Sequence, residues 1–255
     1  MLVTVNEKKS VISFLNLTAD YLKDGHARPH EEIIQEEKPA LPLAYLVDEA
    51  ESLDTEESLD SSESLKTVAE EIAVCKACVL GETRTLAVPG EGAQRPLVMV
   101  IGEGPGADED RAGRPFVGRA GQLLDKMLES IGLNRNKNCF IANMVKCRPP
   151  GNRDPGQDEM GACFPYLERQ IRILEPKLIL CVGRVAAQYL FKTSQGINAL
   201  RGSFVDFEIR ETIIPVLPTF HPSAVLRDES LKRPAWEDLK LLKSRLVTLV
   251  PGYEE

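Results

Sequence analysis

The chain has 255 residues, of which 43% are hydrophobic and 5% aromatic, and its formal net charge is -8 at pH 7. It contains no run of the roughly 20 apolar residues that a membrane span needs, and its first residues lack the basic start, apolar stretch and cleavage site of a secretion signal. Six cysteines without such a signal argue against a disulfide scaffold and favour a reducing compartment, so we expect a cytoplasmic protein with no membrane partner.

Residues 1–66 predict an acidic N-terminal extension, because they contain 6 Lys and Arg against 15 Asp and Glu, while residues 67–255 are nearly neutral. The stretch 48–66 is too polar to bury surface worth its ordering entropy, which predicts a disordered linker. Apolar residues at helical spacing predict a possible short helix over 10–24. This helix would dock on the body or on a protein partner, or it has no role.

The remaining residues, 67–255, predict one domain in which strands and helices alternate. Apolar runs predict strands at residues 96–103, 138–147, 177–183, 203–209 and 211–222. Amphipathic patterns predict helices at residues 118–133, 156–176, 184–191 and 231–250. This alternation is typical of the α/β class, and we expect a three-layer α/β/α fold with a central, mostly parallel sheet.

Three loops of unusual composition follow predicted strands, at residues 102–118, 146–155 and 219–227. The first reads GEGPGADEDRAGRPFVG and combines glycines, prolines and carboxylates with one aromatic side chain, Phe116. Ligands of open parallel sheets bind in loops past the carboxyl ends of the strands. The sequence therefore predicts one binding site at one edge of the sheet.

Four cysteines form a candidate metal-binding set. Cys75 and Cys78 make a C-x-x-C pair, Cys147 ends the second predicted strand, and Cys163 lies in the following helix. Four thiolates suit either Zn²⁺ or an iron–sulfur cluster, and the wide spacing of the second pair weakens the zinc interpretation without deciding the metal. The other two cysteines fall within strand patterns and are predicted to be core thiols; they are Cys139 and Cys181.

His221 is the only histidine between residues 67 and 255. A lone histidine is more often structural than catalytic. This one lies between a predicted strand end and Pro222, in a loop already predicted to bind a ligand, which favours a functional role.

Four motifs in order resemble the family 4 uracil-DNA glycosylases, the iron–sulfur branch of their superfamily: GEGPGADEDRAGRPFVGRAGQLLD, NMVKCRPPGNRDP, CVGRVAAQYLF and PTFHPSAVLR. The resemblance covers about residues 75–250 and leaves the extension without a counterpart. It implies a DNA repair enzyme that flips uracil out of DNA and hydrolyses its N-glycosidic bond, leaving an abasic site. It also implies a monomer that acts on single- or double-stranded uracil-containing DNA, with a [4Fe-4S] cluster held by Cys75, Cys78, Cys147 and Cys163.

The resemblance also implies roles for individual residues. The uracil pocket would consist of Glu103, Gly104, Pro105, Phe116, Asn143 and His221. The catalytic residues would be His221, Glu103 and Glu109. The charges and loops of the sequence itself predict the residues that contact DNA, which are Lys146, Arg148, Arg153, Ser223, Leu226 and Arg227.

These residue types suit uracil excision. Phe116 could stack on the flat base, and the amide of Asn143 matches the O4 acceptor and the N3–H donor of uracil. His221 could stabilise the departing uracil anion. Gly104 stands where other branches carry an aspartate that orients water, so we expect anion stabilisation to dominate, with Glu103 ordering the pocket.

Two alternatives remain open at this point. In the first, the glycine-rich loop holds a nucleotide phosphate in a small-molecule enzyme, although the loop lacks the Lys-Ser/Thr of a P-loop. In the second, the protein is a non-catalytic iron–sulfur module that binds DNA or a partner protein.

Overall fold

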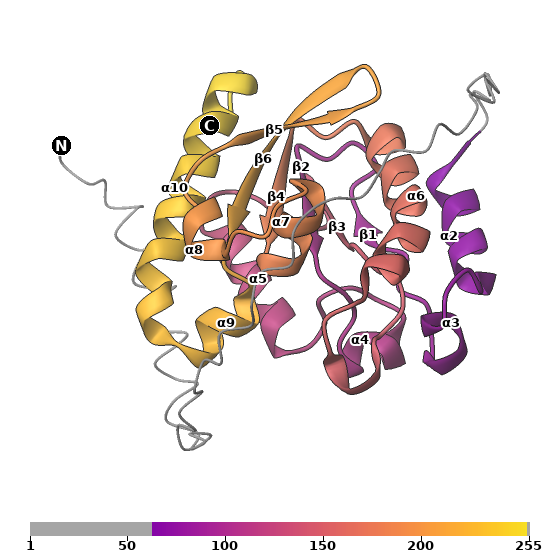
Figure 1. Ribbon diagram of the computed structural model, residues 1–255. Coiled ribbons are helices and arrows are strands. Elements are labelled where there is room, and N and C mark those ends of the chain that lie inside the picture. The colour runs from indigo at the N-terminus through magenta and orange to yellow at the C-terminus, as the bar shows by residue number, and fades with distance from the viewer. Residues whose placement is uncertain (1–62, 254–255) are drawn as a thin grey trace, which may run out of the picture.

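The computed structural model describes residues 63–253 as a three-layer α/β/α fold around one mixed sheet (Figure 1). The possible helix at residues 10–24 and most of the predicted linker lie outside the described residues. The sheet has the order β1-β3-β2-β4-β6-β5, in which the four central strands are parallel and both edge strands run antiparallel. The strands are β1 (Glu91–Gly92), β2 (Val98–Gly102), β3 (Cys139–Asn143), β4 (Leu178–Val182), β5 (Val205–Ile209) and β6 (Thr212–Thr219).

Helices cover both faces of the sheet, as predicted. The α-helices are α2 (Leu65–Val74), α3 (Leu80–Thr83), α4 (Ala107–Ala112), α5 (Arg119–Glu129), α6 (Gln157–Leu174), α7 (Arg184–Leu190), α8 (Ile197–Leu200), α9 (Pro222–Arg227) and α10 (Lys232–Leu249). Buried side chains of α5, α9 and α10 form one apolar core with β2, β3, β4 and β6, and those of α6 and α7 form a second core on the other face. Two 3₁₀ turns, η1 (Pro150–Asn152) and η2 (Glu229–Leu231), complete the described fold.

Strands β2, β3 and β4 are buried along their whole length, because helices cover both of their faces. This explains their near-continuous apolar sequences and the positions of Cys139 and Cys181, which are fully buried, as predicted for core thiols. Strand β3 ends at Asn143, four residues earlier than the sequence pattern indicated. The next two residues still donate backbone hydrogen bonds to the carbonyls of Gly102 and Glu103, so the chain continues beside β2.

The first described residues of the chain are held against helix α6 by ion pairs. Ser64 caps α2, and the guanidinium of Arg169 on α6 pairs with the carboxylates of Glu63 and Glu71. Helix α2 thus begins within the segment assigned to the extension from sequence. Among residues 63–253, no helix is long and apolar enough to cross a membrane.

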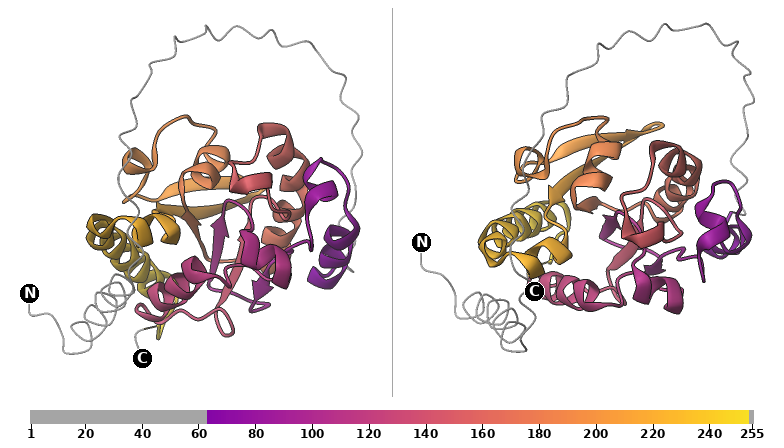
Figure 2. Two further views of the ribbon diagram at one scale, coloured as in Figure 1. Left: turned by 90° about the horizontal axis from the view of Figure 1, so that it is seen from below. Right: turned by 60° about the horizontal axis from the view of Figure 1, so that its bottom comes forward.

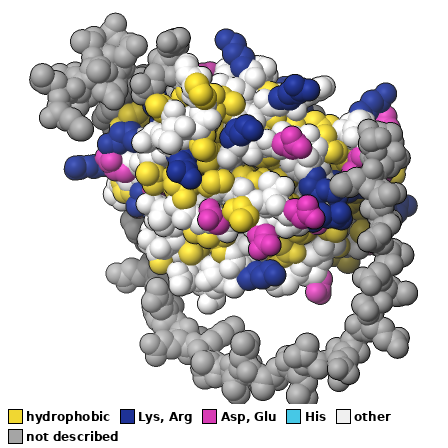
Figure 3. Space-filling model, turned by 90° about the horizontal axis from the view of Figure 1, so that it is seen from above, with side chains coloured by type: hydrophobic (Ala, Val, Ile, Leu, Met, Phe, Trp, Pro, Cys, Tyr) yellow, Lys and Arg dark blue, Asp and Glu magenta, His cyan; other side chains and the backbone are white. Residues whose placement is uncertain are grey.

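The carboxyl ends of the parallel strands meet at the lower edge of the molecule in Figure 1, where α4 and α9 also lie. Figure 2 shows the same edge from below, with the segments that follow β2, β3 and β6 gathered beside one another. Figure 3 shows the opposite face, on which Lys and Arg side chains mix with Asp and Glu. The exposed charges on that opposite face therefore form no track of one sign.

Candidate active site

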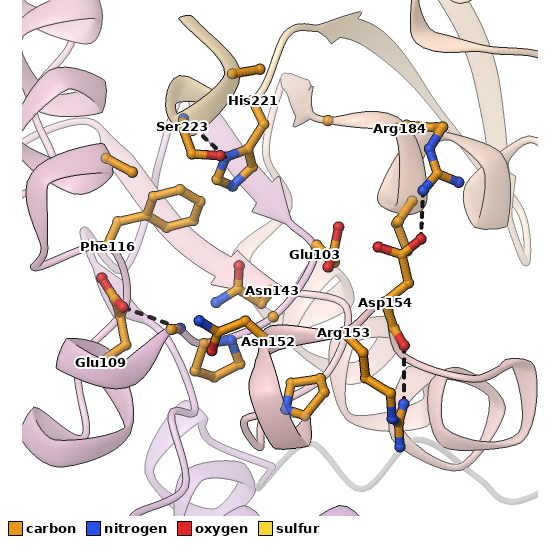
Figure 4. A pocket seen from close by; sticks show the side chains of 18 of the residues that line it. Glu103, Glu109, Phe116, Asn143, Asn152, Arg153, Asp154, Arg184, His221 and Ser223 are labelled. Carbon is orange, nitrogen blue, oxygen red and sulfur yellow. Dashed lines mark hydrogen bonds and ion pairs between the residues drawn. The ribbon is translucent and has the colours of Figure 1, made fainter. Parts of the chain in front are cut away.

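A pocket of about 530 Å³ lies at the carboxyl ends of β2, β3, β4 and β6 (Figure 4). All three loops predicted to form a site contribute to it. The predicted residues that line it are Glu103, Gly104, Pro105, Glu109, Phe116, Asn143, Arg153, His221, Ser223 and Arg227. Sequence reasoning missed three further polar residues in its wall, namely Asn152, Asp154 and Arg184.

Asn143 lies at the base of the pocket with its side-chain amide incompletely bonded. The residue is only 2% exposed, and its Oδ1 has no hydrogen-bond partner among the described residues. A side chain at Gly102 would collide with this oxygen and with the Phe116 ring, so glycine lets both approach β2. Because an unpaired buried acceptor costs about 1–3 kcal/mol, the orphaned oxygen indicates a site for a ligand donor.

Phe116 forms the opposite wall and is held there by its backbone. Its φ of 51° lies in the left-handed region, which a bulky side chain rarely adopts. The buried guanidinium of Arg135 donates to the carbonyls of Pro115 and Phe116 at 2.9 and 2.8 Å, and Gly121 leaves room for the same carbonyl of Phe116. Arg135 was not predicted, because nothing in the sequence links it to a loop 19 residues earlier.

Both carboxylate oxygens of Glu109 accept hydrogen bonds from backbone N–H groups of the same loop. Its Oε1 accepts from the N–H groups of Val117 and Gly118, both at 2.9 Å, and its Oε2 accepts from Gly106 N–H at 3.1 Å. These bonds close the glycine-rich loop around α4 and support the position of Phe116. They also occupy the N–H groups that a phosphate would require, which argues against the phosphate-loop alternative.

His221 caps α9 and faces the Phe116 ring, with a centroid separation of 5.6 Å. Its Nδ1 accepts from the backbone N–H of Ser223 at 3.1 Å and lies 2.8 Å from the Ser223 hydroxyl. Desolvation, followed by the charge of Arg227, lowers the pKa of His221 to about 4. The ring is therefore neutral near pH 7, and because Nδ1 accepts, the proton is on Nε2.

Glu103 lies beside an ion pair between Asp154 and Arg184 on the other side of the pocket (Figure 4). Burial, and then the negative charge of Asp154, raises the pKa of Glu103 to about 7, while Arg184 opposes the shift. A carboxyl group that titrates near neutral pH can exchange a proton during a reaction. Glu103 thus differs from Glu109, whose oxygens are already bonded.

The predicted DNA contacts have different environments. Arg227 is exposed at the pocket, beside the partly buried Ser223. The Arg153 guanidinium is half exposed but forms two hydrogen bonds with Glu159, and Arg148 donates to Asn152. Leu226 is partly buried against the core and does not line the pocket.

The prediction that Lys146 contacts DNA is wrong. Lys146 is only 1% exposed, and its ammonium donates to the Asn143 carbonyl at 2.9 Å and to Gln170 Oε1 at 2.7 Å. Burial lowers the pKa of Lys146 to about 8. The sequence suggested an exposed charge, because lysines are almost never fully buried without partners.

The four candidate cysteine ligands line one cavity between α2, α6 and the end of β3, together with Arg84. Three N–H groups point at their sulfur atoms: Arg84 Nη1 lies 3.0 Å from Cys147 Sγ, Lys146 N lies 3.2 Å from Cys163 Sγ, and Ala77 N lies 3.4 Å from Cys75 Sγ. Such donors stabilise thiolates. Within residues 63–253, no three His, Cys, Asp or Glu side chains form a group that could hold a single metal ion.

Comparisons with known proteins agree with this geometry. Residues 89–240 match the uracil DNA glycosylase superfamily. The chain is 45% identical to a type-4 uracil-DNA glycosylase of Sulfurisphaera tokodaii, covering 71% of this chain and 84% of that protein, and 44% identical to the one of Saccharolobus solfataricus, covering 70% and 85%. It is 43% identical to the type-4 enzyme of Pyrobaculum aerophilum, over 68% of this chain and 89% of that protein. The chain therefore belongs to the type-4 branch of the uracil-DNA glycosylase superfamily.

Proposed function

We propose that this protein excises uracil from DNA by hydrolysing the N-glycosidic bond, leaving an abasic site. The observation that carries the proposal is Oδ1 of Asn143, which has no hydrogen-bond partner within residues 63–253 and lies at the base of a pocket walled by Phe116. Uracil offers the missing donor in its N3–H and a flat face for the ring. Release of free uracil from an oligonucleotide with a single uracil tests the activity directly, and no release by well-folded protein would reject it.

Selectivity for uracil rests on the amide of Asn143. Its Oδ1 would accept from N3–H while its Nδ2 donates to O4. Cytosine carries an amino group in place of O4 and would set donor against donor, a mismatch that a hydrogen-bonding site rejects strongly. Phe116, held by Arg135 and the Glu109 loop, would stack on the base.

Asn143→Asp is expected to lower the rate of uracil excision about tenfold or more, because it removes the donor to O4 and the loss of such a hydrogen bond costs about 1–3 kcal/mol. It is also expected to allow measurable release of cytosine, because the oxygen of an aspartate can accept a hydrogen bond from the cytosine amino group. Single-turnover assays on matched uracil and cytosine oligonucleotides measure both effects. Unchanged uracil kinetics would remove Asn143 from the recognition site, and unchanged affinity for abasic DNA is the control.

Bond cleavage produces a uracil anion and an oxocarbenium-like sugar. The neutral His221 ring, with its proton on Nε2, would donate to O2 as negative charge develops there. Glu103 in its ionised form would accept a proton from the attacking water and stabilise the positive sugar. The Asp154–Arg184 pair would then adjust the fraction of Glu103 that is ionised.

Access to the base requires a flipped nucleotide. Arg227 and Ser223 at the pocket are suited to contact the flanking phosphates, as are Arg148 and the half-exposed Arg153. Leu226 would fill the space that the base leaves, which requires it to move from its partly buried position. The phosphate contacts alone would also suit a non-catalytic DNA-binding module. The side-chain amide of Asn143 inside the pocket favours the enzyme, because a module that only binds DNA does not need a site for a single base.

The four cysteines fit a [4Fe-4S] cluster better than zinc. All four line one cavity, and the sulfur atoms of three of them, Cys75, Cys147 and Cys163, accept N–H bonds. Hydrogen bonds to sulfur are typical of iron–sulfur sites, and the wide separation of Cys147 and Cys163 in the sequence departs from the paired spacing of zinc ribbons. Cys75, Cys78, Cys147 and Cys163 would hold the cluster, which when bound supplies a covalent cross-link between distant segments. Cys75 and Cys78 would thereby be fixed to the segment after β3 and to α6.

Cys147→Ala is expected to reduce the iron content and the yield of folded protein together, because the site forms only when the chain folds around it. Purification without oxygen, followed by iron and zinc analysis and by visible spectroscopy, measures the first effect. Cys181→Ala is the matched control, because that buried thiol lies outside the cavity and its replacement should leave iron unchanged. A colourless wild-type protein with one zinc per chain would contradict the cluster assignment.

A further inference from the structure

Lys146 occupies a position between the cysteine cavity and the candidate uracil pocket. Its side chain is completely enclosed, and its ammonium makes two hydrogen bonds, to the backbone carbonyl of Asn143 and to the side-chain oxygen of Gln170. This carbonyl belongs to Asn143, the residue whose side-chain amide faces the base of the pocket. Because the backbone carbonyl and the side chain of Asn143 share one Cα atom, any movement of that carbonyl would also shift the side-chain amide.

The backbone of Lys146 is fixed on both sides as well. Its N–H donates to Cys163 Sγ at 3.2 Å, and its carbonyl accepts from Val88 N–H at 2.8 Å. Gln170 is held in turn, because its Nε2 donates to the carbonyl of Pro89 at 2.7 Å. Since Gln170 and Cys163 lie on the same helix, α6, Lys146 is connected twice to that helix and once to the end of β3.

Stability alone does not account for a lysine at this place. Removing an ammonium group from water costs several kcal/mol even after relaxation, and well-packed apolar residues often replace buried charges without loss of stability. A methionine of similar length would fill the same space. What it could not do is donate to the Asn143 carbonyl.

We infer that Lys146 is a positioning residue for base recognition. It fixes the backbone of Asn143 so that the side-chain amide of Asn143 meets the base, and it links this backbone to helix α6, which carries Cys163. The inference rests on the proposed role of Asn143 in reading uracil. It concerns hydrogen bonds rather than contact with DNA, so substitution should affect the bound base and leave the DNA backbone contacts intact.

The test uses Lys146→Met in the full-length, iron-loaded protein. Inhibition by free uracil reports the base pocket, and affinity for abasic-site DNA reports the remaining surface. We expect the inhibition constant for uracil to rise about tenfold, the effect of losing one hydrogen bond to a charged group, while affinity for abasic DNA and iron content remain unchanged. Equal losses of both affinities, or no change in uracil inhibition, would overturn the inference.

Two further variants keep the test decisive. Lys232→Met removes another buried lysine, which pairs with Glu229 away from the pocket, and it should leave uracil inhibition unchanged. Gln170→Met removes the second acceptor of Lys146, and it should raise the uracil inhibition constant in the same direction but less. If Lys146→Met does not fold, Gln170→Met decides alone, and wild-type uracil inhibition in it would reject the inference.

The proposed pocket is tested separately by Asn143→Asp in the same inhibition assay. If this variant also binds uracil like the wild type, the recognition site itself is misassigned. If Asn143→Asp weakens uracil binding and the variants of Lys146 and Gln170 do not, only the positioning role fails.

Discussion

His221→Ala is expected to slow the excision step by roughly 10²–10³-fold, the usual loss for one donor to a developing anion. Affinity for uracil-containing DNA should change much less, because the contact strengthens only as charge moves onto the base. The reason lies in the tautomer: Nδ1 accepts from Ser223, so Nε2 carries the proton that O2 of uracil would receive as a hydrogen bond. Single-turnover excision with excess enzyme measures the step.

A structural histidine would give the opposite pattern. Its loss would lower the melting temperature, and activity would fall only in proportion to folded protein, so each variant needs a thermal melt. Ser223→Ala is the graded control, because it removes the hydroxyl beside Nδ1 but keeps the backbone N–H bond. We expect a smaller loss from it, and near-wild-type excision by well-folded His221→Ala would end the proposed mechanism.

The strands and the main helices could be predicted because burial on both faces leaves an unambiguous apolar signal. Every residue of β2 and β4 is buried, which explains their continuous apolar sequences. In α5 and α10 the apolar residues that recur at helical spacing in the sequence are the ones that the structure buries. Short elements were missed. The two residues of β1 carry no period, and α4 and α9, with 6 residues each, are too short for an amphipathic period to show.

The candidate site was predictable as far as its residues stand at the ends of predicted strands. Asn143 is the last residue of β3, Glu103 directly follows β2, and His221 comes two residues after the end of β6. Arg135 and Arg184 were missed, because their roles depend on partners far away in the sequence, Phe116 and Asp154. No local pattern encodes such pairs.

Lys146 and Glu109 show a second limit. Lys146 was assigned to DNA contact by its charge, and Glu109 was assigned to catalysis by the family resemblance. In the structure the first is enclosed and the second is bonded to three backbone N–H groups, so each serves the geometry of its neighbours. Whether a charged side chain faces solvent or the interior depends on packing between distant segments, which a single sequence does not display.

Glu103 gives the second large expected effect, through the pH dependence of the reaction. Its pKa is raised from the ordinary 4.5 to about 7, so the carboxyl is mostly neutral below that pH and ionised above it. If the ionised form accepts the proton of water, the single-turnover rate should rise as pH passes upward through about 7. Glu103→Gln should lose about 10²-fold above pH 7, at the low end of the range for general base catalysis, and its rate should be independent of pH in this range.

Two neighbouring substitutions test whether Glu103 is the group that titrates. Asp154→Asn removes the negative charge that raises the Glu103 pKa, so the rise in rate should move to lower pH. Arg184→Met removes the opposing positive charge, so the rise should move to higher pH. A rate that falls through pH 7, or an inflection that neither variant moves, would exclude Glu103 as the base.

Stability provides an independent check, because it should follow the opposite trend. Between pH 4.5 and about 7 the folded state holds a proton on Glu103 that the unfolded chain has released. The stabilisation from this group is therefore complete below pH 4.5 and is lost as pH rises through about 7. Thermal melts in the assay buffers should show this loss in the wild type and not in Glu103→Gln. A rise in rate with pH cannot then be explained by better folding, since the contribution of Glu103 to stability declines over the same interval.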